Sequence, residues 1–142
     1  MIFDITLFSV GKNKESWLDE ALSEYEKRLK GSIKIEWVLL KNDVELEKAV
    51  FEEKNYIALD PLGKAFSSEE FSRFFIKNIE QDGGKMRLVI GSSEGLTPKL
   101  RSNAKSLISL SLLTFTHQIT RLVLLEQIYR AVQIHKNTPY HK

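Results

Sequence analysis

The sequence predicts an α/β fold, in which a mostly parallel sheet carries helices on both of its faces. Short apolar runs alternate with longer amphipathic stretches, and glycine- or proline-containing turns separate them. The chain has 142 residues, enough to bury the core of one domain, so we expect residues 1–142 to form a single domain. Because ligands of such folds collect beyond the carboxyl ends of the strands, we expect the functional site there.

The first half of the sequence is expected to form three strands and two helices. The strands have β-branched and aromatic residues in short runs, whereas the helices have apolar residues at helical spacing. Gly11 closes the first run, Gly31 ends the first helix, and the turn at residues 61–64 ends the third run. The expected strands are residues 2–10, 33–40 and 56–60, and the expected helices are residues 14–30 and 42–53.

A third helix has the best defined start in the sequence. Ser67 can cap it, and Glu70 three positions later completes a capping box. Phe66 and Phe71 occupy the positions of a hydrophobic staple. This helix should end at residues 82–84, where two glycines follow an aspartate.

A fourth apolar run, residues 86–90, leads into a glycine-rich loop from Gly91 to Leu96, and Thr97-Pro98 then signals a helix start. The loop lacks both the Gly-Lys-Ser/Thr of a P-loop and the glycine spacing of a dinucleotide fingerprint, so ATP hydrolysis and NAD chemistry lose their best support. Its glycines either let a ligand approach the backbone or simply form a turn.

Residues 107–113 alternate apolar residues with serine. They predict another strand, or else an apolar wall with free backbone groups for an aromatic ligand. A long helix follows at residues 117–135 and buries one stripe of apolar residues. The expected stripe is Ile119, Leu122, Val123, Ile128 and Val132. Further apolar residues, Leu124, Leu125 and Ala131, widen this surface, so we expect deep burial or a shared interface in a homodimer.

Charge is distributed unevenly along the chain. Residues 1–94 hold 14 basic and 18 acidic residues, whereas residues 95–142 hold 7 basic residues and one acidic residue, Glu126. A basic second half favours a nucleic acid or phosphate partner, although a solvated basic surface explains it equally well. The absence of cysteine and the scattered histidines predict no metal site, and the lack of an export signal or long apolar run predicts a cytoplasmic protein without membrane contact.

Two features near the end of the sequence have both a simple and a functional interpretation. Glu126 and Arg130 are either an ordinary i,i+4 pair or a substrate-facing arginine oriented by a glutamate. Tyr140, His141 and Lys142 are either a frayed terminus or a group that stacks on a base and binds a phosphate.

Taken together, these motifs resemble the bacterial ribosomal RNA large subunit methyltransferase H family of the SPOUT methyltransferases, over essentially the whole chain. The segments that match are residues 90–96, 110–117, Arg121, 126–131 and 139–142. The resemblance implies a homodimeric enzyme with a deep C-terminal trefoil knot. It also implies transfer of a methyl group from S-adenosylmethionine to N3 of a pseudouridine in 23S rRNA of the assembled ribosome, without a metal.

The resemblance also assigns site residues. The implied cofactor contacts are Leu59, Gly91, Leu110, Ser111, Leu112, Leu113, Thr114 and Phe115. The implied substrate-side residues are Glu126, Arg130, Tyr140, His141 and Lys142. From the chemistry of the imide we expect Arg130 to stabilise the developing anion, His141 or a water to remove the proton, and Tyr140 and Lys142 to dock the RNA.

The sequence departs from the family pattern at two positions beside the expected cofactor site. Ser92 stands where most members have a second glycine, and Thr116 stands where most have a proline. Two alternatives therefore remain open: a SPOUT enzyme that methylates another RNA position, such as a ribose 2′-hydroxyl, and a ribosome-binding module of the same fold without turnover.

Overall fold

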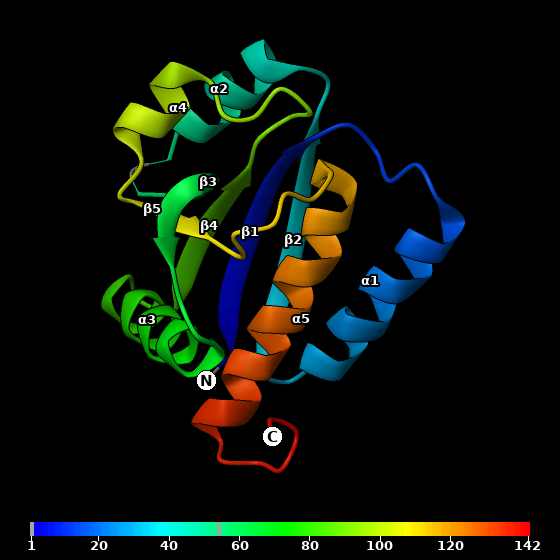
Figure 1. The fold of residues 1–142 in the computed structure, drawn as a ribbon, viewed down its shortest axis with the longest axis vertical. Coiled ribbons are helices and arrows are strands. Elements are labelled where there is room, and N and C mark those ends of the chain that lie inside the picture. Colours follow the sequence, from blue (N-terminus) through cyan, green and yellow to red (C-terminus); the bar gives the residue numbers. More distant parts are fainter. Residues whose placement is uncertain (1, 54) are drawn as a thin grey trace.

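The computed structural model describes residues 2–53 and 55–142 as a five-stranded sheet with helices on both faces (Figure 1). All paired strands are parallel, in the order β2-β1-β4-β3-β5. The strands are β1 Phe3–Val10, β2 Ile33–Leu40, β3 Ile57–Ala65, β4 Lys85–Ile90 and β5 Ser106–Ser109. The helices are α1 Ser16–Leu29, α2 Asp43–Phe51, α3 Ser68–Gln81, α4 Pro98–Asn103 and α5 His117–His135. The predicted α/β architecture is confirmed.

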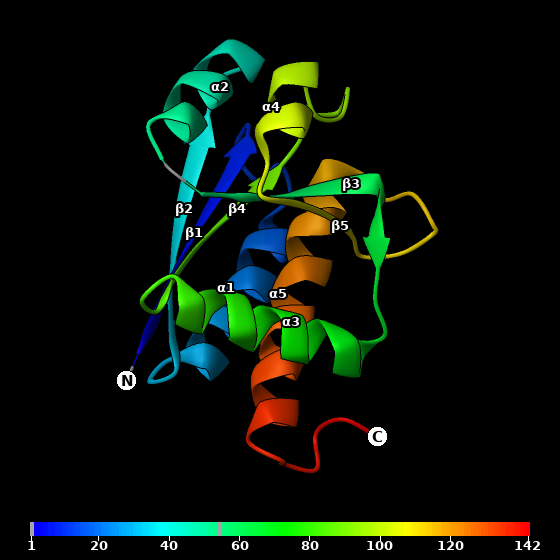
Figure 2. The ribbon, with the colours of Figure 1, turned by 90° about the vertical axis from the view of Figure 1, so that its left-hand side faces the viewer.

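Two apolar cores lie on opposite faces of the sheet. Helices α1, α3 and α5 cover one face, and α2 and α4 cover the other, as Figure 2 shows from the side. Side chains of consecutive residues in the inner strand β1 point to opposite faces of the sheet. Leu7 therefore belongs to the first core and Phe8 to the second. Burial on both faces explains the consecutive apolar residues Leu7-Phe8 in β1 and Leu88-Val89-Ile90 in β4.

The helix starts follow the predicted chemistry. Ser67 Oγ accepts from the Glu70 amide at 3.1 Å, and Glu70 Oε1 accepts from the Ser67 amide at 2.8 Å, so the predicted capping box is present at α3. The rings of Phe66 and Phe71 lie 6.4 Å apart, as a staple requires. Asn42 caps α2 in the same way, accepting from the Glu45 amide at 2.9 Å.

The third strand is longer than predicted. Residues 61–64 do not end it, because β3 bends there and continues beside β5, with a shift in register between Leu59 and Lys64. Gly63 makes this bend possible: a Cβ at this position would lie 2.7 Å from the backbone nitrogen of Ile108. A proline inside a strand is tolerated at such an irregularity, and here Pro61 opens the bend.

The predicted strand at 107–113 is correct only up to Ser109. Beyond it the two serines close a turn: the Ser109 hydroxyl donates to the Ser111 carbonyl at 2.7 Å, and Ser111 Oγ accepts from the Leu113 amide at 2.9 Å. Their spacing of two residues reflects this turn rather than the alternation of a strand.

Helix α5 has the predicted bounds but a different buried face. The residues buried in the core shared with α1 and α3 are Leu124, Leu125, Ile128, Ala131 and Val132, and Arg121 is buried against the end of β1. The predicted stripe was therefore partly wrong, because Ile119, Leu122 and Val123 are only half-buried. Among the described residues no helix is both long and apolar enough to cross a membrane. The trefoil knot stays a prediction.

Candidate functional site

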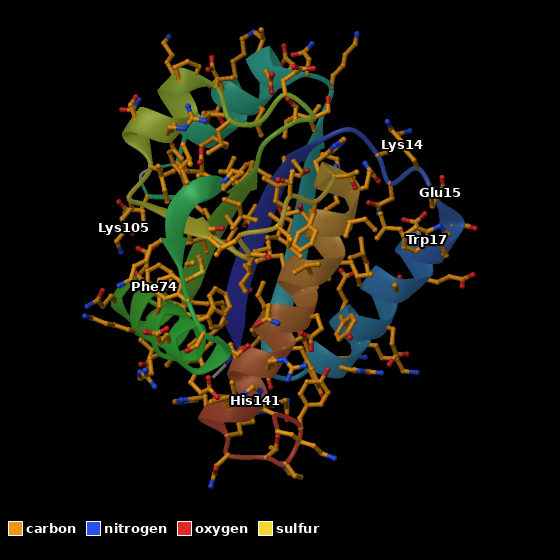
Figure 3. The ribbon with its side chains drawn as sticks, viewed as in Figure 1. Lys14, Glu15, Trp17, Phe74, Lys105 and His141 are labelled. Carbon is orange, nitrogen blue, oxygen red and sulfur yellow. The ribbon has the colours of Figure 1, made fainter. Side chains whose placement is uncertain are left out.

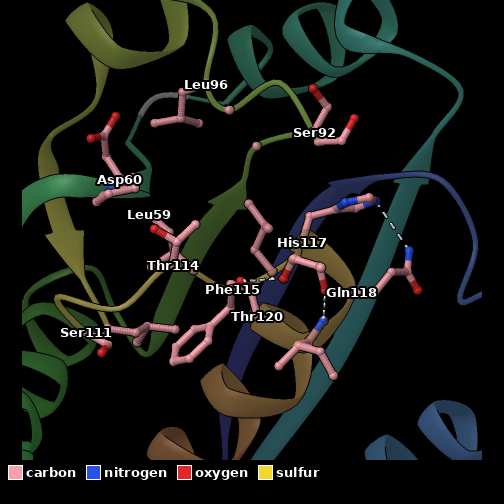
Figure 4. Close-up of a pocket in the computed structure, with 18 of the residues that line it drawn as sticks. Leu59, Asp60, Ser92, Leu96, Ser111, Thr114, Phe115, His117, Gln118 and Thr120 are labelled. Atoms are coloured by element: carbon pink, nitrogen blue, oxygen red, sulfur yellow. Dashed lines mark hydrogen bonds between the residues drawn. The ribbon is translucent and has the colours of Figure 1, made fainter.

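A cavity of about 620 Å³ opens beyond the carboxyl ends of β3, β4 and β5, where their loops meet the start of α5 (Figure 4). Six of the eight residues assigned to the cofactor line it: Leu59, Gly91, Leu110, Ser111, Thr114 and Phe115. Leu112 and Leu113 lie outside its lining, since the Ser111 turn directs them to solvent, where they are 91% and 73% exposed.

Gly91 allows the loop after β4 to fold back on itself. A Cβ at this position would lie 2.6 Å from the Gly95 carbonyl carbon and 2.7 Å from the Leu96 nitrogen. The returning strand of the loop is held by a hydrogen bond from the Gly95 amide to the Ser92 carbonyl at 2.8 Å. The close backbone approach expected at Gly91 is therefore that of the loop to itself, and it sets the shape of this cavity wall.

Both departures from the family pattern are accommodated by local hydrogen bonds. The Ser92 hydroxyl donates to Asp43 Oδ2 at 3.2 Å and accepts from the Glu94 amide at 3.3 Å, which ties the loop to α2. Thr116 is the N-cap of α5, and its hydroxyl oxygen accepts from the Ile119 amide at 3.2 Å. Neither side chain obstructs the fold of the loop that carries it.

An ion pair between a buried aspartate and an exposed arginine lines part of the cavity. The Asp60 side chain, only 2% exposed, accepts from the Leu62 amide at 2.8 Å and from Arg101 Nε at 2.7 Å. The pair fixes the bend of β3 and presents carboxylate oxygens beside the apolar lining. Sequence reasoning noted Leu59-Asp60 as a strand end but missed Arg101, which lies 41 residues away in the chain.

The opposite wall joins the starts of α1 and α5. Gln118 bridges them, accepting from the Lys14 amide and donating to the Lys12 carbonyl, both at 3.1 Å. His117 lines the cavity beside it, and burial together with the charges of Arg121 and Lys14 lowers the pKa of this imidazole. His117 is therefore neutral near pH 7 and offers an uncharged polar group to a ligand.

Arg121 is fully buried and holds the end of β1 against α5. Its guanidinium donates to the Ser9 hydroxyl, the Asn13 side chain and the carbonyls of Val10 and Gly11, at 2.7 to 3.2 Å. Burial lowers the pKa of Arg121, but an arginine remains charged, so these oxygens must solvate the cation. Between Thr120 and Leu122, Arg121 has no local sequence signal that separates this role from that of a surface arginine.

A second cluster of functional side chains forms on the C-terminal half of α5. Arg130 binds Glu126 with two nitrogens, at 2.9 and 3.2 Å. The Tyr140 hydroxyl donates to the same carboxylate at 2.8 Å, and His141 Nδ1 lies 3.0 Å from Arg130. Four of the five predicted substrate-side residues are thus in direct contact, and Lys142 follows them on the exposed surface.

The tail is docked rather than frayed. The Tyr140 ring meets the edge of Tyr129 with centroids 4.7 Å apart, and the Arg130 guanidinium lies 5.0 Å from the Tyr140 centroid. Burial and the hydrogen bond to Glu126 raise the pKa of Tyr140, so its hydroxyl keeps its proton. Figure 3 shows His141 on the segment that folds back below α5.

The cavity lies at the start of α5, and the cluster lies on its second half beside the C-terminal tail. Figure 1 shows the course of this helix down to the C-terminus. The cavity is lined by His117 to Thr120, whereas the cluster begins at Glu126. Thr120 and Arg130 are separated by ten helical residues, or about 15 Å along the axis. Within one chain the cavity and the cluster are therefore separate. In the part of the chain that the structure describes, no group of three or more potential metal ligands comes together.

Comparison with known proteins identifies the family. A family model described as "Predicted SPOUT methyltransferase" matches residues 3–141. The Ribosomal RNA large subunit methyltransferase H of Protochlamydia amoebophila is 51% identical over 138 residues, which cover 97% of this chain and 98% of that protein.

Solved structures agree on the fold. A probable methyltransferase from Bordetella pertussis Tohama I has a TM-score of 0.61 at 10% identity, covering 90% of this chain and 95% of that one. The SpoU methyltransferase AviRb from Streptomyces viridochromogenes, solved in complex with AdoMet, has a TM-score of 0.52 at 13% identity, covering 96% of this chain and 59% of that one. The chain therefore belongs to the SPOUT methyltransferases, and among them to the ribosomal RNA large subunit methyltransferase H family.

Proposed function

We propose that this chain, acting as one domain in the cytoplasm, transfers a methyl group from S-adenosylmethionine to N3 of a pseudouridine in 23S rRNA of the assembled ribosome. Family membership makes it an rRNA methyltransferase of the SPOUT type. The observation that supports the finer assignment is the cluster of Arg130, His141 and Tyr140, because an imide nitrogen needs both a base and a cation.

The cavity suits S-adenosylmethionine in size and chemistry. Its volume of about 620 Å³ lies within the usual range for small-molecule sites of ~300 to 1,000 Å³. Leu59, Leu110 and Phe115 supply an apolar surface for the adenine, while the loops at residues 91–96 and 110–116 bring backbone groups to its edge. When bound, this cofactor supplies an electrophilic methyl group on a sulfonium, which becomes a neutral thioether after transfer.

The tail cluster provides what the substrate requires. Pseudouridine N3 becomes strongly nucleophilic as its proton leaves, and negative charge then spreads onto the neighbouring carbonyl oxygens. Arg130 can stabilise that charge, since the hydrogen bonds that it donates to Glu126 hold its guanidinium in place and raise its pKa. Tyr140 offers an aromatic surface, and Lys142 a flexible cation, for docking the RNA.

The separation of the cavity and the cluster leads us to propose a homodimer with composite sites. Because the catalytic Arg130 proposed here lies about 15 Å along the helix from the cavity residue Thr120, we propose that the cluster of one protomer faces the cavity of its partner. Exposed apolar side chains around the cavity support this arrangement, since Trp17, Leu112 and Leu113 lie on its rim or beside it. A stable interface should bury roughly 1,200 Å² or more in total.

The decisive experiment is mass spectrometry of nucleosides from the rRNA of cells with and without the gene, repeated with purified ribosomes and enzyme. N3-methylpseudouridine should appear only with the enzyme. A ribose-methylated product would favour the first alternative. Cofactor binding without any product would favour a ribosome-binding module.

The first prediction concerns the loop that shapes the cavity. Gly91→Val should weaken S-adenosylmethionine binding by roughly tenfold or more in calorimetry, because the added side chain forces the loop backbone apart. Ser92→Gly in the same loop is the matched control, and its affinity for S-adenosylmethionine should stay within about twofold of wild type. Unchanged affinity in a folded Gly91→Val protein would remove this loop from the cofactor site.

The second prediction tests the composite site. Heterodimers are isolated by two affinity tags from cells that express a Gly91→Val chain together with an Arg130→Ala chain. They should show about half of the wild-type rate, because one of the two symmetric sites keeps an intact cavity and an intact cluster. Inactive heterodimers would mean that each chain works alone, and light scattering that shows a monomer at micromolar concentration would exclude the dimer.

A further inference from the structure

A glutamate from α3 lies against the imidazole of the tail. Glu69 Oε1 is 2.7 Å from His141 Nε2, although the two residues are 72 positions apart in the sequence. On the other side of the ring, His141 Nδ1 is 3.0 Å from a guanidinium nitrogen of Arg130. The imidazole is thus held between a carboxylate and a guanidinium, each on a different helix.

These two partners assign the tautomer of His141. A guanidinium has only donors, so Nδ1 must accept from Arg130 and has no proton. Nε2 then carries the ring proton and donates it to Glu69, and this hydrogen bond lowers the pKa of the carboxyl group. The unprotonated nitrogen therefore lies directly beside the Arg130 donor.

We propose that Glu69 is a positioning residue that fixes this tautomer of His141, so that Arg130 and His141 together recognise and deprotonate the imide edge of the substrate base. The inference rests on the proposed function and deepens it. Adjacent Arg130 N–H and His141 Nδ1 form a donor beside an acceptor. An imide edge presents the complement, a carbonyl oxygen beside the N3 proton.

The same geometry identifies the proton acceptor. When the edge replaces the Arg130–His141 hydrogen bond, the N3 proton is donated to Nδ1 and the carbonyl oxygen accepts from Arg130. Proton transfer then leaves the negative charge on the imide beside the guanidinium and the positive charge on the imidazole beside Glu69. With the other tautomer, Arg130 and His141 would both be donors, and N3–H would have no acceptor.

The neighbouring glutamate provides a matched control. Glu70 has the same side chain in the same turn of α3, but it accepts from the Ser67 amide at 2.8 Å and completes the capping box. Removing it tests the loss of an acidic residue from this helix terminus without touching His141. Glu69→Gln provides a rescue, because its amide oxygen can still accept from Nε2.

The test combines a spectroscopic and a kinetic measurement. Long-range ¹H–¹⁵N spectra are recorded at a pH where the His141 imidazole is uncharged. Wild type and Glu70→Ala should show the ring proton on Nε2, and Glu69→Ala should show a mixture of tautomers. With ribosomes as substrate, Glu69→Ala should lower kcat by roughly tenfold to a hundredfold while KM changes less than about threefold. Glu69→Gln should recover most of that loss, and Glu70→Ala should change only thermal stability.

The outcomes separate this inference from the proposed function. A wild-type proton on Nδ1, a tautomer unaffected by Glu69→Ala, or an unchanged kcat in that variant would overturn the role of Glu69 even if N3-methylpseudouridine is the product. A product methylated elsewhere would overturn the proposed function, and with it the recognition of an imide, even with the tautomer intact.

Discussion

Arg130→Ala should lower the rate of ribosome methylation by roughly a hundredfold to a thousandfold, the effect of removing a donor aimed at a developing anion. The loss should appear in kcat more than in KM, because the negative charge forms only as N3 loses its proton. Affinity for S-adenosylmethionine should not change, since the cavity lies at the start of α5. Single-turnover kinetics with saturating ribosomes would measure the chemical step directly.

The chain offers a close control for this substitution. Arg28 on α1 pairs with Glu24 at 2.9 Å, with the same i,i+4 spacing and the same distance as Arg130 and Glu126. Arg28→Ala removes an equivalent surface pair but no contact to His141, so its rate should stay within about twofold of wild type. Arg130→Ala retaining more than about a tenth of the wild-type rate would contradict the assigned charge stabilisation.

The sequence predicted best where local chemistry decides the structure. The Ser67–Glu70 capping box and the Phe66–Phe71 staple specify a helix start from residues within five positions of one another. Alternation of apolar runs and amphipathic stretches likewise predicted the parallel sheet. These signals succeed because the interactions behind them join near neighbours in the chain.

Prediction failed where distant residues decide. Pro61 and Gly63 suggested a turn, but pairing with Ile108 of β5 keeps the chain extended there. The buried face of α5 depends on the positions of α1 and α3, which periodicity cannot supply for a helix whose apolar residues do not gather on one side.

The same limit applies to the candidate site. Arg121 joins residues more than 100 positions apart, and the contact between Glu69 and His141 spans 72. The residues next to Arg121 and Glu69 in the sequence do not distinguish them from an arginine or a glutamate that is exposed to solvent. The resemblance assigned the tail residues to the substrate side, but the contact of the tail with α3 is visible only in the structure.

Deleting Tyr140, His141 and Lys142 should abolish detectable methylation while leaving S-adenosylmethionine affinity within about twofold of wild type. The deletion removes the proposed proton acceptor and the proposed RNA-docking residues together, but no residue that lines the cavity. Unlike a frayed terminus, however, this tail packs against Tyr129 and bonds to Glu126. We therefore expect a loss of about 1 to 2 kcal/mol in the free energy of unfolding, instead of the negligible change expected for a terminus without contacts.

Two smaller changes divide this effect into its parts. Tyr140→Phe keeps the ring contact and removes only the hydrogen bond to Glu126, so it should cost stability without abolishing the reaction. His141→Ala should lower kcat less than the full deletion, because water can replace a base but cannot replace the docking contacts. A truncated enzyme that methylates ribosomes at the wild-type rate would show that the tail is structural. The proton would then have to leave to water, with Arg130 alone stabilising the anion.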